Sequence, residues 1–276
     1  MSFGELSKNL TDDKLSCEFS GNADAQLLVD FLFENAIKIF KIEWIVNDPQ
    51  FEMYSPEYVL TKFLGQLLAH PNVTFSSLKK FTLVHTEFDE RSSQLLADLI
   101  RTLPHIREIR IINAESFGDH AKPVYEAMQA TKNLRNVTLK NCGLQLKDAH
   151  SIFIDYLPFK DSIDLSCNDF SDGTFPLNLS GFETAHTIKT LSLNSCGLDE
   201  NNLAVIGVAL TTNNTLTYMD LSHNSLTPYA IDSIRTSIQY NWSLRKLDMF
   251  CMFKNMELDK EVQILREHNP HIAISY

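Results

Sequence analysis

The 276-residue chain lacks the features that mark membrane-spanning and secreted proteins. No run of apolar residues reaches the roughly 18 that a helix needs to cross a bilayer. The first residues have neither a basic start nor an apolar stretch, and glycine is not at the second position, so neither a secretory nor a myristoylation signal is predicted. The five cysteines are an odd number without paired spacing, which favours a reducing compartment. We therefore expect a cytoplasmic protein without membrane insertion.

Sequence motifs that carry catalysis or phosphate binding are also missing. The chain contains no H-E-x-x-H zinc helix, no G-x-x-x-x-G-K-[ST] phosphate loop and no G-x-S-x-G nucleophile elbow. The nine histidines are scattered, and several lie where helix ends or turns are expected. We therefore predict no enzyme activity, no cofactor and no metal site.

Basic residues are outnumbered, with 24 Lys and Arg against 35 Asp and Glu, which gives a formal charge of −11. Residues 1–60 hold eleven acidic side chains against four lysines, a local net charge of −7, so the remaining residues carry only −4. An acidic molecule repels phosphate backbones, and we expect no nucleic-acid partner. Two interpretations stay open: the acidity serves solubility, or it matches a partner protein with a basic surface.

A short pattern of apolar residues recurs through most of the chain. The pattern L-x-x-L-x-L-x-x-N/C-x-L is found, for example, at 134–144, 188–198 and 216–226. Most copies are 28 residues apart, and such a period indicates a repeat protein. The second apolar position of the successive copies falls at Leu15, Ile42, Phe81, Ile109, Val137, Ile163, Leu191, Met219, Leu247 and Ile272.

Segments with helical periodicity lie between these predicted strands, at 92–100, 201–210 and 229–238. Thr227 before Pro228 is a plausible start for the last of them, because threonine caps helices and proline suits the first helical position. Asp199 or Asn201 is an equally plausible start for the middle one. Each repeat is therefore predicted to be one strand followed by one helix.

These 28-residue strand–helix units resemble the ribonuclease-inhibitor-like subclass of leucine-rich repeat proteins, as does the alternation of Cys142, Asn168, Cys196 and Asn224 at one repeat position. Ran GTPase-activating proteins, tropomodulin-like actin cappers and NOD-like receptors carry repeats of this kind. The resemblance implies an α/β solenoid, or horseshoe, with a parallel sheet on the concave face and helices on the convex face. Cys142 and Cys196 then point into the turn after each strand as structural residues.

The predicted domain organisation is a single leucine-rich repeat domain over residues 1–276. It comprises an N-terminal capping repeat over 1–38, regular repeats over 39–249 and a C-terminal cap over 250–276. Residues 170–182 contain two glycines and a proline where sibling repeats have helices, so we expect a loop there.

Alternation along each strand predicts two columns of side chains that face away from the core. The central column comprises Ser16, Glu43, Thr82, Arg110, Thr138, Asp164, Ser192, Asp220 and Asp248. The next column comprises Glu18, Ile45, Val84, Ile112, Lys140, Ser166, Asn194, Ser222 and Phe250.

Three aliphatic residues of the second column, Ile45, Val84 and Ile112, come from successive strands and are predicted to form one stripe. A contiguous exposed apolar stripe often marks an interaction site. The alternative is that the N-terminal capping segments or a long loop cover it. Arg110, from the central column of the same half, is also a candidate partner contact.

The C-terminal half of the columns is acidic and small, with Asp164, Asp220 and Asp248 among serines and asparagines, and Phe250 beside them. Small neighbours leave room for long Lys or Arg side chains of a partner, so these four residues are candidate contacts. The alternative is an ordinary solvated face.

The step between Ile42 and Phe81 is 39 residues long, and residues 47–56 hold much of the excess. Two prolines bracket Phe51 and Tyr54 there, so the loop either presents these aromatic side chains to a partner or folds them back over the repeat edge.

These observations favour a non-catalytic protein–protein interaction module, acting as scaffold, adaptor or inhibitor through its concave face and the 47–56 loop. We expect a monomer. Three alternatives stay open: a GTPase-activating or other enzyme-regulating protein, a structural subunit of a cytoskeletal or ciliary assembly, and a pathogen effector that binds a host protein.

Overall fold

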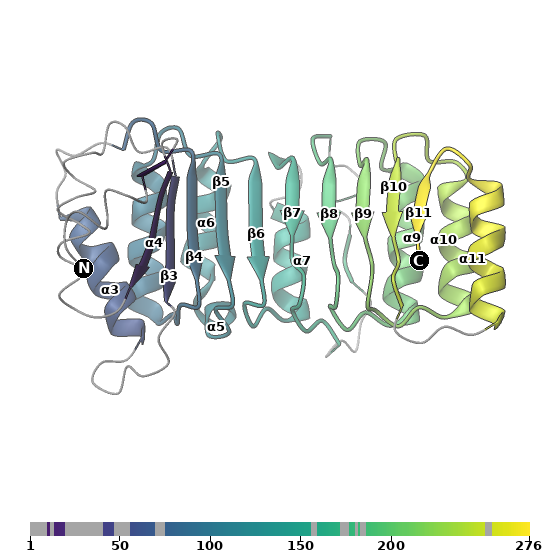
Figure 1. Cartoon of the computed structure of the whole chain (residues 1–276), viewed down its shortest axis with the longest axis horizontal. Coiled ribbons are helices and arrows are strands. Elements are labelled where there is room, and N and C mark those ends of the chain that lie inside the picture. Colours follow the sequence, from purple (N-terminus) through teal and green to yellow (C-terminus); the bar gives the residue numbers. More distant parts are fainter. Residues whose placement is uncertain are drawn as a thin grey trace. The chain divides into compact units, whose positions relative to one another are not determined.

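The computed structural model describes two compact units, Met1–Gly143 and Leu144–Tyr276 (Figure 1). The residues that it describes are 10–11, 14–19, 41–46, 56–69, 75–155, 159–171, 177–179, 182, 186–251 and 256–276. The predicted organisation as one domain with two caps stays a prediction. No helix among the described residues is both long and apolar enough to cross a membrane.

The strands of the first unit follow one another across the sheet in chain order. The first pair is antiparallel, and every later pair within this unit is parallel. Ile42 lies opposite Phe81, and Ile109 lies opposite Val137, so the predicted repeat positions share one register. The strands are β1 (Leu10–Thr11), β2 (Lys14–Phe19), β3 (Lys41–Val46), β4 (Lys80–Val84), β5 (Glu108–Ile112) and β6 (Asn136–Lys140).

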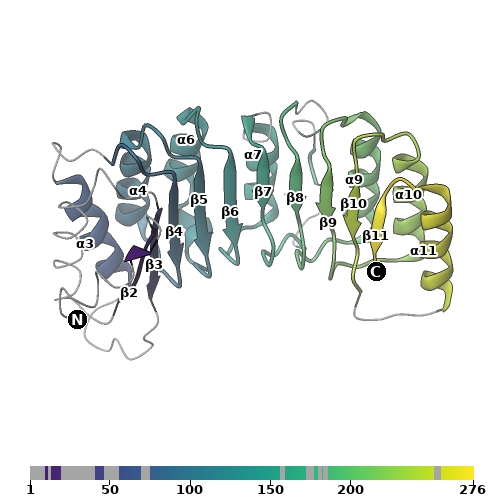
Figure 2. The same ribbon diagram turned by 45° about the horizontal axis from the view of Figure 1, so that its top comes forward.

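Helices line one side of the strands in the first unit (Figures 1 and 2). The predicted helix over 92–100 is confirmed and begins two residues earlier, because Asp89 caps it by accepting a hydrogen bond from Ser92 N. Its apolar face packs toward the sheet, where Leu96 and Ile100 are buried. The helices are α3 (Pro56–Leu68), α4 (Glu90–Thr102), α5 (Phe117–His120) and α6 (Lys122–Ala130).

The second unit repeats the same plan, and its neighbouring strands are all parallel. Its strands are β7 (Ser162–Asp164), β8 (Thr190–Ser192), β9 (Tyr218–Asp220), β10 (Lys246–Asp248) and β11 (Ala273–Ser275). Its helices are α7 (Leu146–Asp155), α9 (Glu200–Thr212), α10 (Pro228–Ile238) and α11 (Met256–His268). The predicted α/β class, with a parallel sheet on one side and helices on the other, is confirmed.

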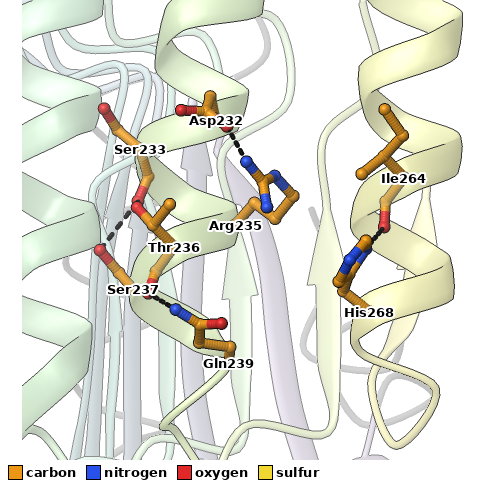
Figure 3. Close-up of polar contacts among 8 residues, drawn as sticks. All are labelled: Asp232, Ser233, Arg235, Thr236, Ser237, Gln239, Ile264 and His268. Carbon is orange, nitrogen blue, oxygen red and sulfur yellow. Dashed lines mark hydrogen bonds and ion pairs between the residues drawn. The ribbon is translucent and has the colours of Figure 1, made fainter.

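The helix starts in this unit follow the cap residues of the sequence. Thr227 caps α10 by accepting from Ala230 N at 3.2 Å, with Pro228 at the first helical position. Asp199, and not Asn201, caps α9 by accepting from Asn202 N at 2.8 Å. Polar side chains of α10 and α11 return to their own helices: Ser237 Oγ donates to Ser233 O, and His268 Nδ1 lies 2.8 Å from Ile264 O (Figure 3).

Only part of the predicted loop over 170–182 belongs to the described residues. Phe170, Ser171 and the segment 177–179 form neither helix nor strand, as the glycines and proline predict. Phe170 is fully buried, so this repeat still contributes an apolar side chain to the core.

Asparagine and cysteine at the repeat turn tie each strand to its neighbour. Asn224 Nδ2 donates to Leu193 O at 2.8 Å, while its Oδ1 accepts from Cys196 N and Leu198 N, both at 3.1 Å. The buried Cys196 thiol donates to Leu165 O at 3.2 Å, and Cys142 makes the equivalent bond in the first unit. Burial raises the pKa of Cys196 to about 12, so the sulfur stays a neutral thiol. The predicted structural role of these two cysteines is confirmed.

Candidate partner-binding face

The sheet face of each unit is the side of its strands that points away from the helices. In the second unit, register places Asp164 opposite Ser192, Ser192 opposite Asp220, and Asp220 opposite Asp248. Neighbouring strands are about 4.8 Å apart, so these four side chains form one row, the aspartate row. The sequence-predicted central column is therefore brought together in this unit.

Two carboxylates of the aspartate row are held by local hydrogen bonds. Asp164 Oδ1 accepts from Ser166 N at 3.0 Å and from Ser166 Oγ at 2.6 Å. Asp220 Oδ1 accepts from Ser222 N at 2.9 Å. Both aspartates are half-buried, so each carboxylate is fixed in position and still reaches solvent.

The small residues between the aspartates leave less space than the sequence suggests. Ser166 and Ser222 are only 5% and 1% exposed, and the prediction that they face an open surface is wrong. Their short side chains lie beneath the carboxylates, where Ser166 Oγ also bonds to Ser192 Oγ at 2.8 Å. A partner would therefore contact the carboxylates themselves rather than cavities between them.

Asp248 was predicted to be an exposed partner contact, and the structure contradicts this because the residue is 6% exposed. Lys246 Nζ and Tyr218 OH donate to its Oδ2 at 2.6 and 2.8 Å. Lys246 Nζ also lies 4.8 Å from the centre of the Tyr218 ring, a cation–π contact. The charge of Asp248 is thus matched within the unit, and only Asp164 and Asp220 remain as acidic contacts for a partner.

Ionisation of this cluster follows from burial and hydrogen bonding. Burial acts to raise the pKa of Asp248, but hydrogen bonds from Lys246, Ser275 and Tyr218 outweigh it and hold the pKa below its ordinary value. Burial raises the pKa of Tyr218 well above its usual range, and its bond to Asp248 and the charge of Asp220 act in the same direction. The cluster therefore contains an ionised carboxylate and a neutral phenol at physiological pH.

Phe250 provides an apolar surface beside the aspartate row. Its backbone N donates to Ser222 Oγ at 3.0 Å, which fixes the residue next to β9. Its side chain is 48% exposed, so the prediction that it faces outward is confirmed. Asp164, Asp220 and Phe250 are hence the candidate contacts of this unit that reach solvent.

The aliphatic stripe of the first unit has the predicted register, since Ile45 lies opposite Val84 and Val84 lies opposite Ile112. Val84 and Ile112 are half-buried, so they are less open than a fully exposed stripe. The side chain of Ile45 lies outside the described residues. Arg110 on β5 is also half-buried.

Thr82, which was predicted to face outward, is 2% exposed, and that prediction is wrong. Side chains on adjacent strands about 4.8 Å apart shield a short side chain between them. Phe51 and Tyr54 of the 47–56 loop lie outside the described residues, and their contact with a partner stays a prediction.

Several surface features lie outside the predicted columns. Trp242 and Tyr240, in the turn before β10, are 75% and 69% exposed, and Trp242 stacks on His271 at 5.4 Å. The sequence analysis missed them because it followed strand positions only. It also missed a left-handed residue after the strands, which the 28-residue spacing of His85, Asn113, Asn141, Cys167, Ser195 and His223 would have revealed. Within the described residues, no group of three or more His, Cys, Asp or Glu is arranged to hold a metal ion.

No family model matches the chain. A crystal structure of a Bacteroides fragilis protein is similar over 99% of this chain and 77% of its own length, with a TM-score of 0.58 and 12% sequence identity. Actin-binding site 2 of leiomodin-1 matches 63% of this chain and 87% of its own length, at 18% identity and a TM-score of 0.39. The tropomodulin C-terminal domain of Caenorhabditis elegans matches 90% of this chain and 93% of its own, at 12% identity and a TM-score of 0.22. These structures are leucine-rich-repeat-like, and the 28-residue strand–helix units give this chain a fold of that type.

Proposed function

We propose that this chain is a protein-interaction module whose second unit binds a basic segment of a partner protein on its sheet face. One observation carries the proposal: the carboxylates of Asp164 and Asp220 are fixed on either side of Ser192, beside the half-exposed ring of Phe250. We also propose that the repeats belong to the ribonuclease-inhibitor-like subclass, which their 28-residue strand–helix units support, and that the protein acts in the cytoplasm as a monomer.

The chemistry of this surface favours a Lys or Arg side chain. Among the described residues, Asp164 uses Oδ1 for its hydrogen bonds to Ser166, so Oδ2 can accept from a partner. Asp220 Oδ2 has only a long contact with Asn194 Nδ2, at 3.4 Å. The neighbouring cation, Lys246, is already engaged with Asp248. A charged donor from the partner would complete the row.

Phe250 adds an apolar contact to this electrostatic attraction. Lys and Arg bury their aliphatic stems on apolar surfaces while their charged ends stay polar. A guanidinium or ammonium group at Asp220 would thus place its stem across the ring on the neighbouring strand. The same arrangement already exists inside the unit, where Lys246 lies over Tyr218 and bonds to Asp248.

The experiment compares the tagged wild type with Asp164→Asn/Asp220→Asn in affinity capture from cell lysate, read by quantitative mass spectrometry. Asparagine keeps the oxygen that accepts from Ser166 and Ser222 and removes only the charge, so the fold is preserved. A protein captured by the wild type should be lost, and its affinity, measured afterwards by calorimetry, should fall about tenfold. Phe250→Ser should also weaken binding.

The matched control is Asp155→Asn/Glu257→Gln, which removes two negative charges from exposed positions on α7 and α11. It should capture the same protein as the wild type. Equal loss in both double variants would mean that net charge, and not the sheet face, governs binding. Retention of the partner by Asp164→Asn/Asp220→Asn would contradict the proposal.

A further inference from the structure

Positive charge gathers on one edge of the first unit, although the whole chain is acidic. Three short segments, 75–79, 103–107 and 131–135, lead into strands β4, β5 and β6, and none contains Asp or Glu. Together they contribute four cationic side chains, and His105 lies among them. We define the basic edge by these four residues: Lys79, Arg107, Lys132 and Arg135.

Backbone hydrogen bonds place three of these residues side by side. Arg107 N donates to Lys79 O at 2.8 Å, and Arg135 N donates to Arg107 O at 2.9 Å. They are 28 residues apart in sequence, one repeat each, so their Cα atoms follow one another at about the 4.8 Å strand spacing. The result is a row of cations across three strands.

Packing explains why the charged side chains point outward. The residue before each member of the row is an apolar anchor, and Leu78, Ile106 and Leu134 are 1%, 0% and 0% exposed. The next residue along an extended chain points the opposite way. Arg107, Lys132 and Arg135 are accordingly exposed, and Lys79 is half-buried.

Acidic side chains at the neighbouring positions already have cations of their own. Glu108 pairs with Lys80 Nζ at 2.7 Å, and Asp98 pairs with Arg101 at 2.8 Å. These two pairs leave the positive charge of the basic edge in place.

The segments that carry the basic edge are fastened to each other and to the helices. Asn133 Nδ2 donates to Pro104 O at 2.7 Å, which joins two adjacent segments. Thr131 Oγ1 donates to Ala127 O at 2.7 Å, and Leu103 N donates to Ile100 O at 3.2 Å. A surface held in this way loses little conformational freedom when it binds.

We propose that the basic edge is a second docking surface, which binds an acidic extended segment of a partner protein. Guanidinium groups of Arg107 and Arg135 match carboxylates in charge and in bidentate geometry. The surface lies in a different unit from the aspartate row and has the opposite charge, so this proposal is independent of the proposed function.

A protein segment fits this surface better than a nucleic acid does. Screening limits each charge to about 8 Å at physiological salt, so a short acidic segment interacts mainly with the row itself. A polyphosphate chain would extend past the row into the field of a molecule with a net charge of −11.

The test measures fluorescence anisotropy of a labelled peptide of alternating glutamate and serine, at low salt and at about 0.15 M salt. The wild type should bind, and salt should weaken binding. Arg107→Glu/Arg135→Glu should lower the affinity by about tenfold or more, because two attractions become repulsions. Arg107→Gln/Arg135→Gln should give a smaller loss, and it decides the question if the reversal variant does not fold by circular dichroism.

The matched control is Arg91→Glu/Lys122→Glu, which makes the same change in net charge. Both residues are exposed at the starts of α4 and α6, the opposite edge of the unit, where negative charge suits the helix dipole. Its affinity should stay within about twofold of the wild type, because these charges lie beyond the screening distance. Absence of wild-type binding, equal loss in the two charge-reversal variants, or tighter binding of an oligouridylate of equal charge would each overturn the proposal.

Discussion

Asp248 contributes to stability through its charge, and this contribution depends on pH. Its hydrogen bonds hold the folded-state pKa below the ordinary value of 3.8, so ionised Asp248 stabilises the fold above that value. The contribution is lost as pH falls through the lowered pKa. Asp248→Asn should therefore unfold in urea with a free energy about 2 kcal/mol lower at pH 7, since Lys246 loses a buried partner. The difference from the wild type should narrow below about pH 4.

Asp155→Asn, at an exposed position on α7, should change neither the stability at pH 7 nor its dependence on pH. A gap between wild type and Asp248→Asn that is constant from neutral to acid pH would contradict this account. Strand alternation placed Asp248 on the sheet face correctly. Its burial was not predictable, because Tyr218 comes from a different repeat and Lys246 bends back along its own strand.

At the scale of elements, α9 and α10 approach closely at Gly207. A Cβ atom added there would lie 3.2 Å from Ser233 O and 3.3 Å from Ser237 Oγ, two atoms that bond to each other on α10 (Figure 3). Gly207→Val should therefore push the two helices apart and lower the free energy of unfolding by about 2 kcal/mol. Denaturant unfolding of Val208→Ala provides the control, because Val208 is 61% exposed on the same helix and should have little effect.

An unchanged stability of Gly207→Val would mean that α10 adjusts to the added side chain without cost. The helix itself was predictable from the apolar period over 201–210, and so was its start near Asp199. The glycine was not, because a glycine inside a helix is intrinsically unfavourable, and only the neighbouring helix explains its presence.

At the scale of the whole molecule, the 28-residue period was sufficient to predict strand order and register. It depends on the apolar positions, and Ile163 opposite Leu191 and Leu191 opposite Met219 obey it. The candidate site was predictable only in part, because outward-facing residues do not affect the repeat and their pairing depends on neighbours 26 to 30 residues away. The basic edge likewise emerges only when Arg107 and Arg135 are placed on adjacent strands.

Among the described residues β11 is the outermost strand of the second unit, and its edge bears on whether the protein stays a monomer. Ala273 N and Ser275 O bond toward β10, so the backbone of Ile274 faces outward. The Arg266 guanidinium occupies this edge by donating to Ile274 O from Nε at 3.3 Å and Nη2 at 3.1 Å. An open strand edge invites pairing with another chain. Arg266→Ala should therefore self-associate with increasing concentration in sedimentation velocity, whereas the wild type and Lys260→Ala, an exposed control on α11, should remain monomeric. A strictly monomeric Arg266→Ala would show that the charge and twist of the edge suffice to protect it without this side chain.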